Sequence, residues 1–267
     1  MSRIQQALSR ARDEGRVAVI AYLTAGFPEP EAMPGLVRAL VEGGADAIEL
    51  GLPFSDPLAD GATVQRASFQ ALQQGMTPAR LLTLIRELRQ GGVVIPLIVM
   101  TYYNPVLAYG EDAFLNDAAT AGADGLIAVD VPPEEAEGLS ASCRASGLDF
   151  IPLLAPTSTD DRVALAVQQA SGFVYCVSVA GVTGARTELS PDLGAFLERV
   201  RRQTELPLAV GFGISRREHV EALRGRADAA IVGSAIVDSI EAAPQQEREK
   251  RVRDYVEVLT GRKQARV

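Results

Sequence analysis

Short apolar runs alternate with amphipathic stretches along the whole chain. The stretches, such as PEAMPGLVRALVEGG and PARLLTLIRELRQGG, place apolar residues three and four positions apart and end in Gly, which is typical of surface helices. The apolar runs are short and β-prone, and strands that are apolar on both faces and alternate with helices indicate a parallel sheet. Eight runs are found: 17–26, 46–51, 96–103, 125–131, 149–156, 173–181, 207–215 and 229–237.

Eight strand–helix units in 267 residues predict an α/β fold, a (β/α)8 TIM barrel formed by one domain over residues 1–267. An open, doubly wound sheet is the alternative. Three strands are introduced by similar phrases, GGADAIEL, AGADGLIAVD and GRADAAIVG, which indicates a repeated βα unit. IQQALSRARDEG predicts an extra N-terminal helix before the first strand, and residues 247–267 predict a final helix with a solvated tail.

The composition narrows the class of protein. The chain has 26 basic and 34 acidic residues and a formal net charge of −8, which argues against a nucleic-acid partner. The longest apolar runs, such as VVIPLIVM, are too short to cross a bilayer, so no membrane association is expected. Because the first residues lack the apolar centre of a signal peptide, we expect a cytoplasmic protein.

Three residue types are scarce, and this restricts the chemistry. The single histidine, His219, lies in SRREHVEAL, which is interpreted as an exposed helix; the cysteines Cys143 and Cys176 form no CxxC pair. These residues cannot supply a zinc site of the usual kind, so no metal is expected. The only lysines, Lys250 and Lys263, lie near the C-terminus, which argues against a Schiff base. Acid–base chemistry is therefore left to Asp, Glu or Tyr.

The second apolar run, DAIELGLPF, carries Glu49 near its carboxyl end. Alternation along a strand places Glu49 on the same face as Ala47 and opposite Ile48 and Leu50. Active sites of barrels lie at the carboxyl ends of the strands, and a carboxyl group buried there should have a raised pKa. A buried ion pair with an arginine is the structural alternative.

The loop after this run presents two aspartates, Asp56 and Asp60, and contains Pro53 and Pro57, which restrict its backbone. Asp60 is a candidate for a second carboxylate above the same barrel mouth. An aspartate in a loop is also commonly a turn former or a helix cap. The sequence favours neither the catalytic nor the structural interpretation of Asp60. Asp56 lies in SDP, a common turn, and has the weaker case.

Two glycine-containing turns, GFGIS (211–215) and VGSAI (232–236), end the seventh and eighth runs. Loops at these positions of a barrel often bind phosphate through backbone N–H groups, and no lysine lies nearby. Residues 179–193, rich in Gly and Thr, predict either a mobile lid or an ordinary flexible loop. Tyr175 is a candidate hydrogen-bond donor to the substrate or a core residue.

The segments ELGLPFSDPLADG, MTYYNP, VDVPPEE, VSVAGVTGAR, VGFGIS and IVGSAIV, in this order, resemble the tryptophan synthase alpha subunit family. The resemblance implies a lyase that cleaves indole-3-glycerol phosphate to indole and glyceraldehyde 3-phosphate. It implies Glu49 as the acid–base residue and Asp60 as the second catalytic carboxylate. The implied substrate-binding residues are Tyr22, Met100, Ile127, Tyr175 and Phe212, and the implied phosphate-binding residues are Gly184, Gly213, Gly233 and Ser234.

The resemblance also implies a partner, the beta subunit of tryptophan synthase, with two alpha and two beta chains in the complex. Pyridoxal phosphate is expected on that partner and no cofactor in this chain. Residues 53–60, which include Asp56, and 179–193 are the segments expected to couple the subunits. Val179 stands at a position where some members of the family carry Arg, and Tyr22 stands where the resemblance leads us to expect Phe. Another phosphate-binding barrel enzyme and a catalytically weak scaffold that activates a partner are the alternative functions.

Overall fold

The computed structural model describes residues 1–178, 191–211 and 213–263, and it confirms the predicted α/β barrel. All strand pairs are parallel, in the order β5-β4-β3-β2-β1-β9-β8-β7-β6. The strands are β1 Ala18–Thr24, β2 Ala47–Gly51, β3 Leu97–Thr101, β4 Gly125–Ala128, β5 Asp149–Phe150, β6 Leu153–Leu154, β7 Val174–Val177, β8 Leu208–Gly211 and β9 Ala229–Val232.

The fifth predicted strand is divided, which explains why eight runs give nine strands. Its first half, β5, pairs with β4, and its second half, β6, pairs with β7. Between the halves, Ile151 donates its N–H to Leu126 and Pro152 accepts from the N–H of Tyr175. Pro152 has no N–H of its own, so the ladder is interrupted there. The two ends of the sheet order are thus neighbours in the chain, and the ring of strands closes at this point.

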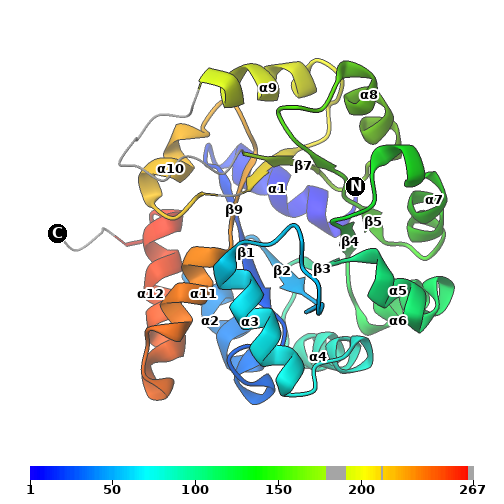
Figure 1. Cartoon of the computed structure of the whole chain (residues 1–267). Coiled ribbons are helices and arrows are strands. Elements are labelled where there is room, and N and C mark those ends of the chain that lie inside the picture. Colours follow the sequence, from blue (N-terminus) through cyan, green and yellow to red (C-terminus); the bar gives the residue numbers. More distant parts are fainter. Residues whose placement is uncertain (179–190, 212, 264–267) are drawn as a thin grey trace.

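Helices surround the strands on the outside (Figure 1). Apolar side chains on their inner faces, such as Leu36 and Leu40 of α2, pack with outward strand residues such as Ile48 and Leu50 in one large core. The α-helices are α1 Arg3–Asp13, α2 Met33–Gly43, α3 Ala62–Gln73, α4 Pro78–Gln90, α5 Tyr103–Tyr109, α6 Glu111–Ala121, α7 Glu137–Ala145, α8 Asp160–Gln169, α9 Pro191–Arg201, α10 Arg217–Ala222, α11 Ser234–Glu241 and α12 Arg248–Thr260. Short 3-10 helices are η1 Pro30–Ala32, η2 Pro133–Glu135 and η3 Gln245–Glu247. None of the helices in the described ranges is both long and apolar enough for a membrane span.

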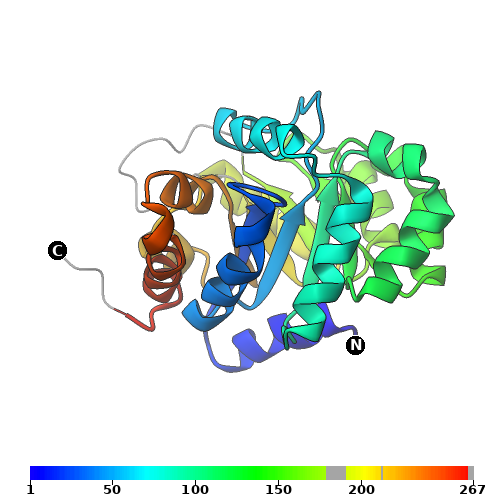
Figure 2. The ribbon, with the colours of Figure 1, turned by 90° about the horizontal axis from the view of Figure 1, so that it is seen from below.

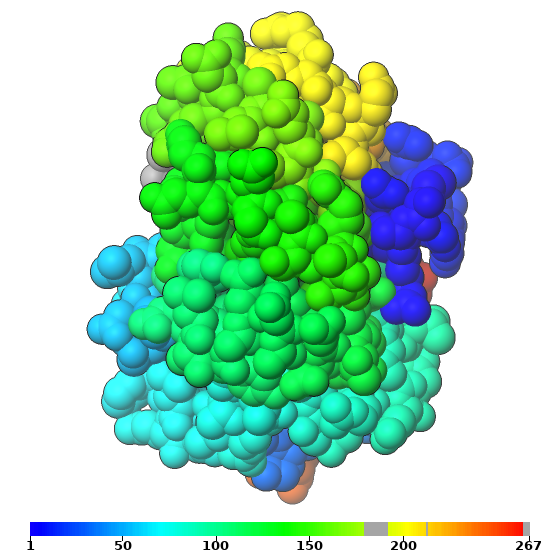
Figure 3. Space-filling model, turned by 90° about the vertical axis from the view of Figure 1, so that its right-hand side faces the viewer, coloured from blue at the N-terminus to red at the C-terminus, as the bar shows by residue number. Residues whose placement is uncertain are grey.

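The predicted N-terminal helix, α1, is present and closes the N-terminal end of the barrel. It starts with a capping box between Ser2 and Gln5, so its first N–H groups have partners. Ile4, Leu8 and Ala11 are buried in a second apolar cluster with the inward residues of the strands. In Figures 2 and 3, α1 and the loop after β2 lie at opposite ends of the barrel. The end covered by α1 therefore belongs to the core, and the other end holds the loops.

The three repeated phrases of the sequence form one repeated structure at the N-terminal end. In each phrase the aspartate accepts a hydrogen bond of 2.8 Å from an N–H near the beginning of the preceding strand and pairs with an arginine. The sets of aspartate, N–H donor and arginine are Asp46, Val19 and Arg16; Asp124, Leu97 and Arg89; and Asp228, Leu208 and Arg201.

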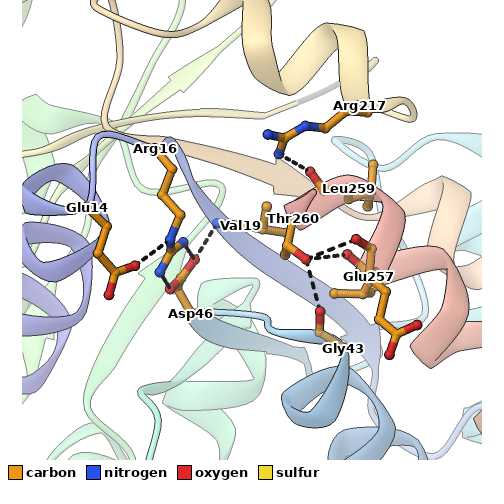
Figure 4. A network of polar contacts seen from close by, with 10 residues as sticks. Glu14, Arg16, Val19, Gly43, Asp46, Arg217, Glu257, Leu259 and Thr260 are labelled. Atoms are coloured by element: carbon orange, nitrogen blue, oxygen red, sulfur yellow. Dashed lines mark hydrogen bonds and ion pairs between the residues drawn. The ribbon is translucent and has the colours of Figure 1, made fainter. Parts of the chain in front are cut away.

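Figure 4 shows the first of these sets, in which the guanidinium of Arg16 binds both carboxylate oxygens of Asp46 at 2.7 and 2.8 Å. Glu14 accepts a further hydrogen bond from Arg16 at 2.7 Å. In the same view the hydroxyl of Thr260 donates to the carbonyl of Gly43 at 3.0 Å, which ties α12 to the end of α2. These contacts hold the beginnings of β1 and β2, and the helices α2 and α12, in fixed positions relative to one another.

Candidate active site

A cavity of about 490 Å³ lies at the carboxyl ends of the strands. Both candidate carboxyl groups, Glu49 and Asp60, line it together with residues of the two glycine turns. Of the remaining expected site residues, those that line the cavity are Tyr22, Met100, Tyr175, Gly213, Gly233 and Ser234. The structure therefore brings residues from β1, β2, β3, β7 and the last two turns around one space.

Glu49 lies on β2, in register with Tyr22 of β1 and Ile98 of β3. Its side chain is fully buried, and neither carboxyl oxygen has a hydrogen-bond partner among the described residues. Burial raises the pKa of Glu49 to about 8, because the charged form loses its water. Glu49 forms no ion pair with an arginine in the described part of the chain, so the structural alternative is wrong there. Glu49 can therefore exist in both protonation states near neutral pH.

Asp60 lies in the loop between β2 and α3 and is partly buried. Burial raises its pKa to about 6, and a long hydrogen bond of 3.4 Å from the hydroxyl of Tyr102 opposes this rise. The same hydroxyl accepts the N–H of Ala59 at 2.8 Å, so Tyr102 also holds the loop. The N-cap of α3 is Gly61, with no side-chain hydrogen bond, so Asp60 is not the helix cap. Its carboxyl group is left to face the cavity.

Two tyrosines form parts of the cavity wall in the same way. Tyr22 lies against Gly51 of β2, and Tyr175 lies against Gly211 of β8. A Cβ at either glycine would overlap the phenol ring, so each glycine provides the space that its tyrosine occupies. Burial raises the pKa of both phenols, which remain protonated and available as hydrogen-bond donors. The hydroxyl of Tyr22 lies 3.1 Å from that of Thr24.

The glycine turns present backbone N–H groups to the cavity. Gly213 has a φ of +78°, and a Cβ there would meet nothing within 4 Å, so a ligand can approach this backbone. Gly233 is the N-cap of α11, and the N–H groups of Ser234 and Ala235 in the first turn have no intrahelical acceptor. All four residues line the cavity. An anion is the ligand that such a set of donors favours.

Three expected site residues lie elsewhere or cannot be placed. Ile127 is in register with Met100 and fully buried among the inward side chains, but it does not line the cavity in the described part of the chain. Phe212 and Gly184 lie outside the described residues, as do positions 179–190 of the expected lid, including Val179. Residues 191–193 of that segment begin α9.

The sequence interpretation missed several residues of the cavity. His219 is not an exposed helical residue as expected, because it is half-buried and lines the cavity with Arg216 from the beginning of α10. Asp238 of α11 lines it as well, and Tyr102 supports Asp60 from the residue before α5. Both Arg216 and His219 directly follow the GFGIS turn, and this adjacency is the signal that could have revealed them. The described residues contain no cluster of His, Cys, Asp and Glu placed to hold a metal ion.

Comparison with known proteins gives consistent results. The sequence matches the family described as "Tryptophan synthase alpha chain" over residues 8–266. A tryptophan synthase alpha chain from Roseiflexus castenholzii is 51% identical over 261 residues, which cover 98% of this chain and 100% of that protein. The crystal structure of tryptophan synthase subunit alpha from Legionella pneumophila is similar with a TM-score of 0.90 and 36% identity, covering 98% of both chains. A chain of the aminoacrylate-bound form of tryptophan synthase from M. tuberculosis has a TM-score of 0.86 and 36% identity, covering 97% of this chain and 98% of that chain.

Proposed function

The chain belongs to the tryptophan synthase alpha chain family, and we propose that Glu49 and Asp60 are the carboxyl groups that carry out its reaction. The alpha reaction is the retro-aldol cleavage of indole-3-glycerol phosphate to indole and glyceraldehyde 3-phosphate in tryptophan biosynthesis. The chain is therefore a carbon–carbon lyase. The observation that carries the assignment of roles is a fully buried Glu49 that lines the cavity and whose carboxyl oxygens have no hydrogen-bond partner among the described residues.

The reaction breaks the bond between ring carbon C3 of the indole and the adjacent glycerol carbon. Protonation of C3 places positive charge on the ring nitrogen, so the ring becomes the electron sink. Loss of the proton from the glycerol hydroxyl then forms the aldehyde, and the electrons of the broken bond return to the ring. One group must move protons at both positions, and a second must stabilise the ring nitrogen while it is positive.

Glu49 suits the first role because a pKa of about 8 allows it to give and accept a proton near neutral pH. Asp60, with a pKa of about 6, is charged at neutral pH and can accept a hydrogen bond from the ring N–H. Its negative charge then stabilises the positive charge that develops on the ring. The chemistry needs no Schiff base and no metal in this scheme, since the indole ring itself takes up the electrons.

The same cavity accounts for the rest of the substrate in this proposal. Tyr22, Met100 and Tyr175 line the space beside the carboxyl groups and would contact the indole. Ile127, the register partner of Met100 on β4, and Phe212, which precedes Gly213 in the sequence, are the further contacts implied by the family. The phosphate would bind the backbone of Gly213, Gly233 and Ser234, with Gly184 as the further contact implied by the family. We also expect the enzyme to act in the cytoplasm.

The proposed partner is a beta subunit that carries pyridoxal phosphate and consumes the indole, in a complex of two alpha and two beta chains. Leu58, in the loop that holds Asp60, is 95% exposed, and Leu107 of α5 is 54% exposed. The hydrogen bond from Ala59 to Tyr102 holds this loop against the beginning of α5, so the two leucines belong to neighbouring segments. Exposed apolar residues on the loop that holds Asp60 and on α5 support a docking face on these segments, with Asp56 as a coupling residue.

The decisive experiment measures indole release from indole-3-glycerol phosphate by the purified chain, alone and with a beta subunit. We expect slow release by the chain alone and faster release with the partner. No release in either condition would reject the proposed roles, and equal rates would reject the coupling.

A further inference from the structure

The charged side chains that line the cavity, apart from Arg216, disfavour the binding of a phosphate group. Its described lining contains three acids, Glu49, Asp60 and Asp238, and one cationic side chain, Arg216. A phosphate monoester carries close to two negative charges at neutral pH, because its second pKa is about 6. Backbone N–H groups alone would have to hold this dianion near three carboxyl groups.

Asp238, which lies nearest in sequence to the glycine turn of α11, is partly neutralised from α3. Its Oδ1 accepts a hydrogen bond of 3.0 Å from Thr63 and lies 3.6 Å from the guanidinium of Arg66. Arg66 also pairs with Glu241 at 3.1 Å, so its charge is shared between two acids. Asp238 therefore retains part of its repulsion toward an anion in the cavity.

Arg216 is available to an anion. The ion pairs of its helix belong to Arg217 and Arg224, which both contact Glu221. Arg216 forms no ion pair with any residue in the described ranges, is exposed, lines the cavity and lies three residues after Gly213. An arginine that has no ion pair within the described part of the chain and lies beside exposed backbone N–H groups suits the binding of a phosphate.

The turn that carries Arg216 is held from two sides. The N–H of Ser215 donates to Nδ1 of His219 at 3.3 Å, and the carbonyl of Ser215 accepts from the hydroxyl of Tyr255 at 2.7 Å. Since Nδ1 acts as an acceptor, the hydrogen of the neutral imidazole is on Nε2. His219 lines the cavity together with Arg216 and Gly213, and Nε2–H is the hydrogen-bond donor that its ring still offers.

We propose that Arg216 and His219 contact the substrate phosphate and determine its affinity, in addition to the backbone of the two glycine turns. The inference rests on the proposed function, since it assigns the phosphate end of that substrate to this end of the cavity. Arg216 supplies the charge that offsets Asp238, and His219 supplies a neutral donor and fixes the turn. Both residues bind the phosphate, and neither takes part in the proton transfers that Glu49 carries out.

The test uses the full chain and glycerol 3-phosphate as the probe, with dissociation constants measured by calorimetry at low and high NaCl. Arg216→Gln should weaken binding about tenfold at low salt, as expected for a lost charge-assisted hydrogen bond, and should reduce the salt dependence. Arg216→Lys should recover most of the affinity. Arg224→Gln is the matched control, because it removes the same charge just after α10 and does not line this cavity; it should bind like the wild type.

Steady-state kinetics with indole-3-glycerol phosphate provide the second measurement. Arg216→Gln should raise KM with little change in kcat, and His219→Asn, which keeps an acceptor for Ser215, should raise KM by a smaller factor. Unchanged affinity and KM in Arg216→Gln would overturn the inference while wild-type indole release still supported the lyase. Arg216-dependent binding without any indole release would instead retain the phosphate site and reject the proposed function.

Discussion

Carboxyl groups occur at both ends of this barrel, in opposite surroundings. At the N-terminal end, Asp46, Asp124 and Asp228 each accept a backbone N–H and pair with an arginine at 2.5 to 2.7 Å. At the C-terminal end, Glu49 is more deeply buried and has no partner among the described residues, and Asp60 has one long hydrogen bond. The three aspartates have their hydrogen-bond partners, whereas Glu49 at the other end has none among the described residues.

The difference teaches how one fold separates stability from chemistry. A paired carboxylate stabilises the structure, and removing one partner leaves the other charged and partly buried. An unpaired buried carboxyl group destabilises the empty protein in its charged form, and its raised pKa makes it useful for proton transfer. In this chain Asp46, Asp124 and Asp228 pair with arginines at the N-terminal end, and Glu49, which has no partner among the described residues, lines the cavity at the other end.

The largest expected effect is that of Glu49→Gln on turnover. The variant should fold normally, bind glycerol 3-phosphate like the wild type, and lose about 10²–10⁴-fold in kcat, because a positioned acid–base group typically contributes this factor. Indole release and the calorimetric affinity are measured on the same preparation. Turnover within a few-fold of wild type, at about equal affinity, would remove Glu49 from its assigned role.

The converse change, Asp124→Ala, should reduce stability and spare the chemistry. Its carboxylate binds Arg89 and Arg3 at 2.5 Å and the N–H of Leu97 at 2.8 Å. Losing these should lower the free energy of unfolding by about 3 kcal/mol, as for other broken ion pairs with limited exposure. Denaturant unfolding gives the value.

The control is Asp13→Ala, an exposed acid that forms no ion pair with the described residues, with an expected change within about 0.5 kcal/mol. The kcat of Asp124→Ala at a temperature where it is folded should match wild type. If Asp124→Ala lost activity and kept its stability, the contrast between the two ends would be wrong.

A pH series should reveal the cost of burying Glu49. The pKa of Glu49 in the folded protein, about 8, lies above the ordinary value of 4.5. The contribution of Glu49 to the free energy of unfolding is therefore complete at low pH and is lost as the pH rises toward 8. Relative to wild type, Glu49→Gln should therefore become more stable from pH 5 to pH 8, by up to about 1.4 kcal/mol per pH unit. Unfolding free energies of both proteins without ligand test this. A constant difference across the range would show that Glu49 is not desolvated in solution.

The smallest effect is expected for Tyr102→Phe. Its hydroxyl donates to Asp60 and thereby lowers the pKa of that carboxyl group, which burial raises. Without it, the pKa of Asp60 should rise and the acidic limb of the kcat/KM profile should move to higher pH. A loss of a few-fold in kcat/KM is expected near neutral pH, since one hydrogen bond contributes about 1 kcal/mol. If the acidic limb did not move, the titration of Asp60 would not be what determines it.

The sequence by itself determined the alternation of strands and helices, the extra N-terminal helix and the strand face that Glu49 shares with Ala47. These follow from apolar periodicity, because burial of apolar side chains decides which face of an element points to the core. The repeated ADA and ADG phrases were visible too, although their arginine partners were not. Arg89 and Asp124 are 35 residues apart, and only the packing of successive units brings them together.

The tertiary structure alone decided which polar groups meet. The fifth run divides at Pro152 because its two halves pair with different neighbours when the ring closes. Tyr102 reaches Asp60 across 42 residues, and His219 turns from an apparent surface residue into part of the cavity wall. Local patterns record burial along one element, whereas these contacts depend on how loops from distant strands converge at one end of a closed barrel.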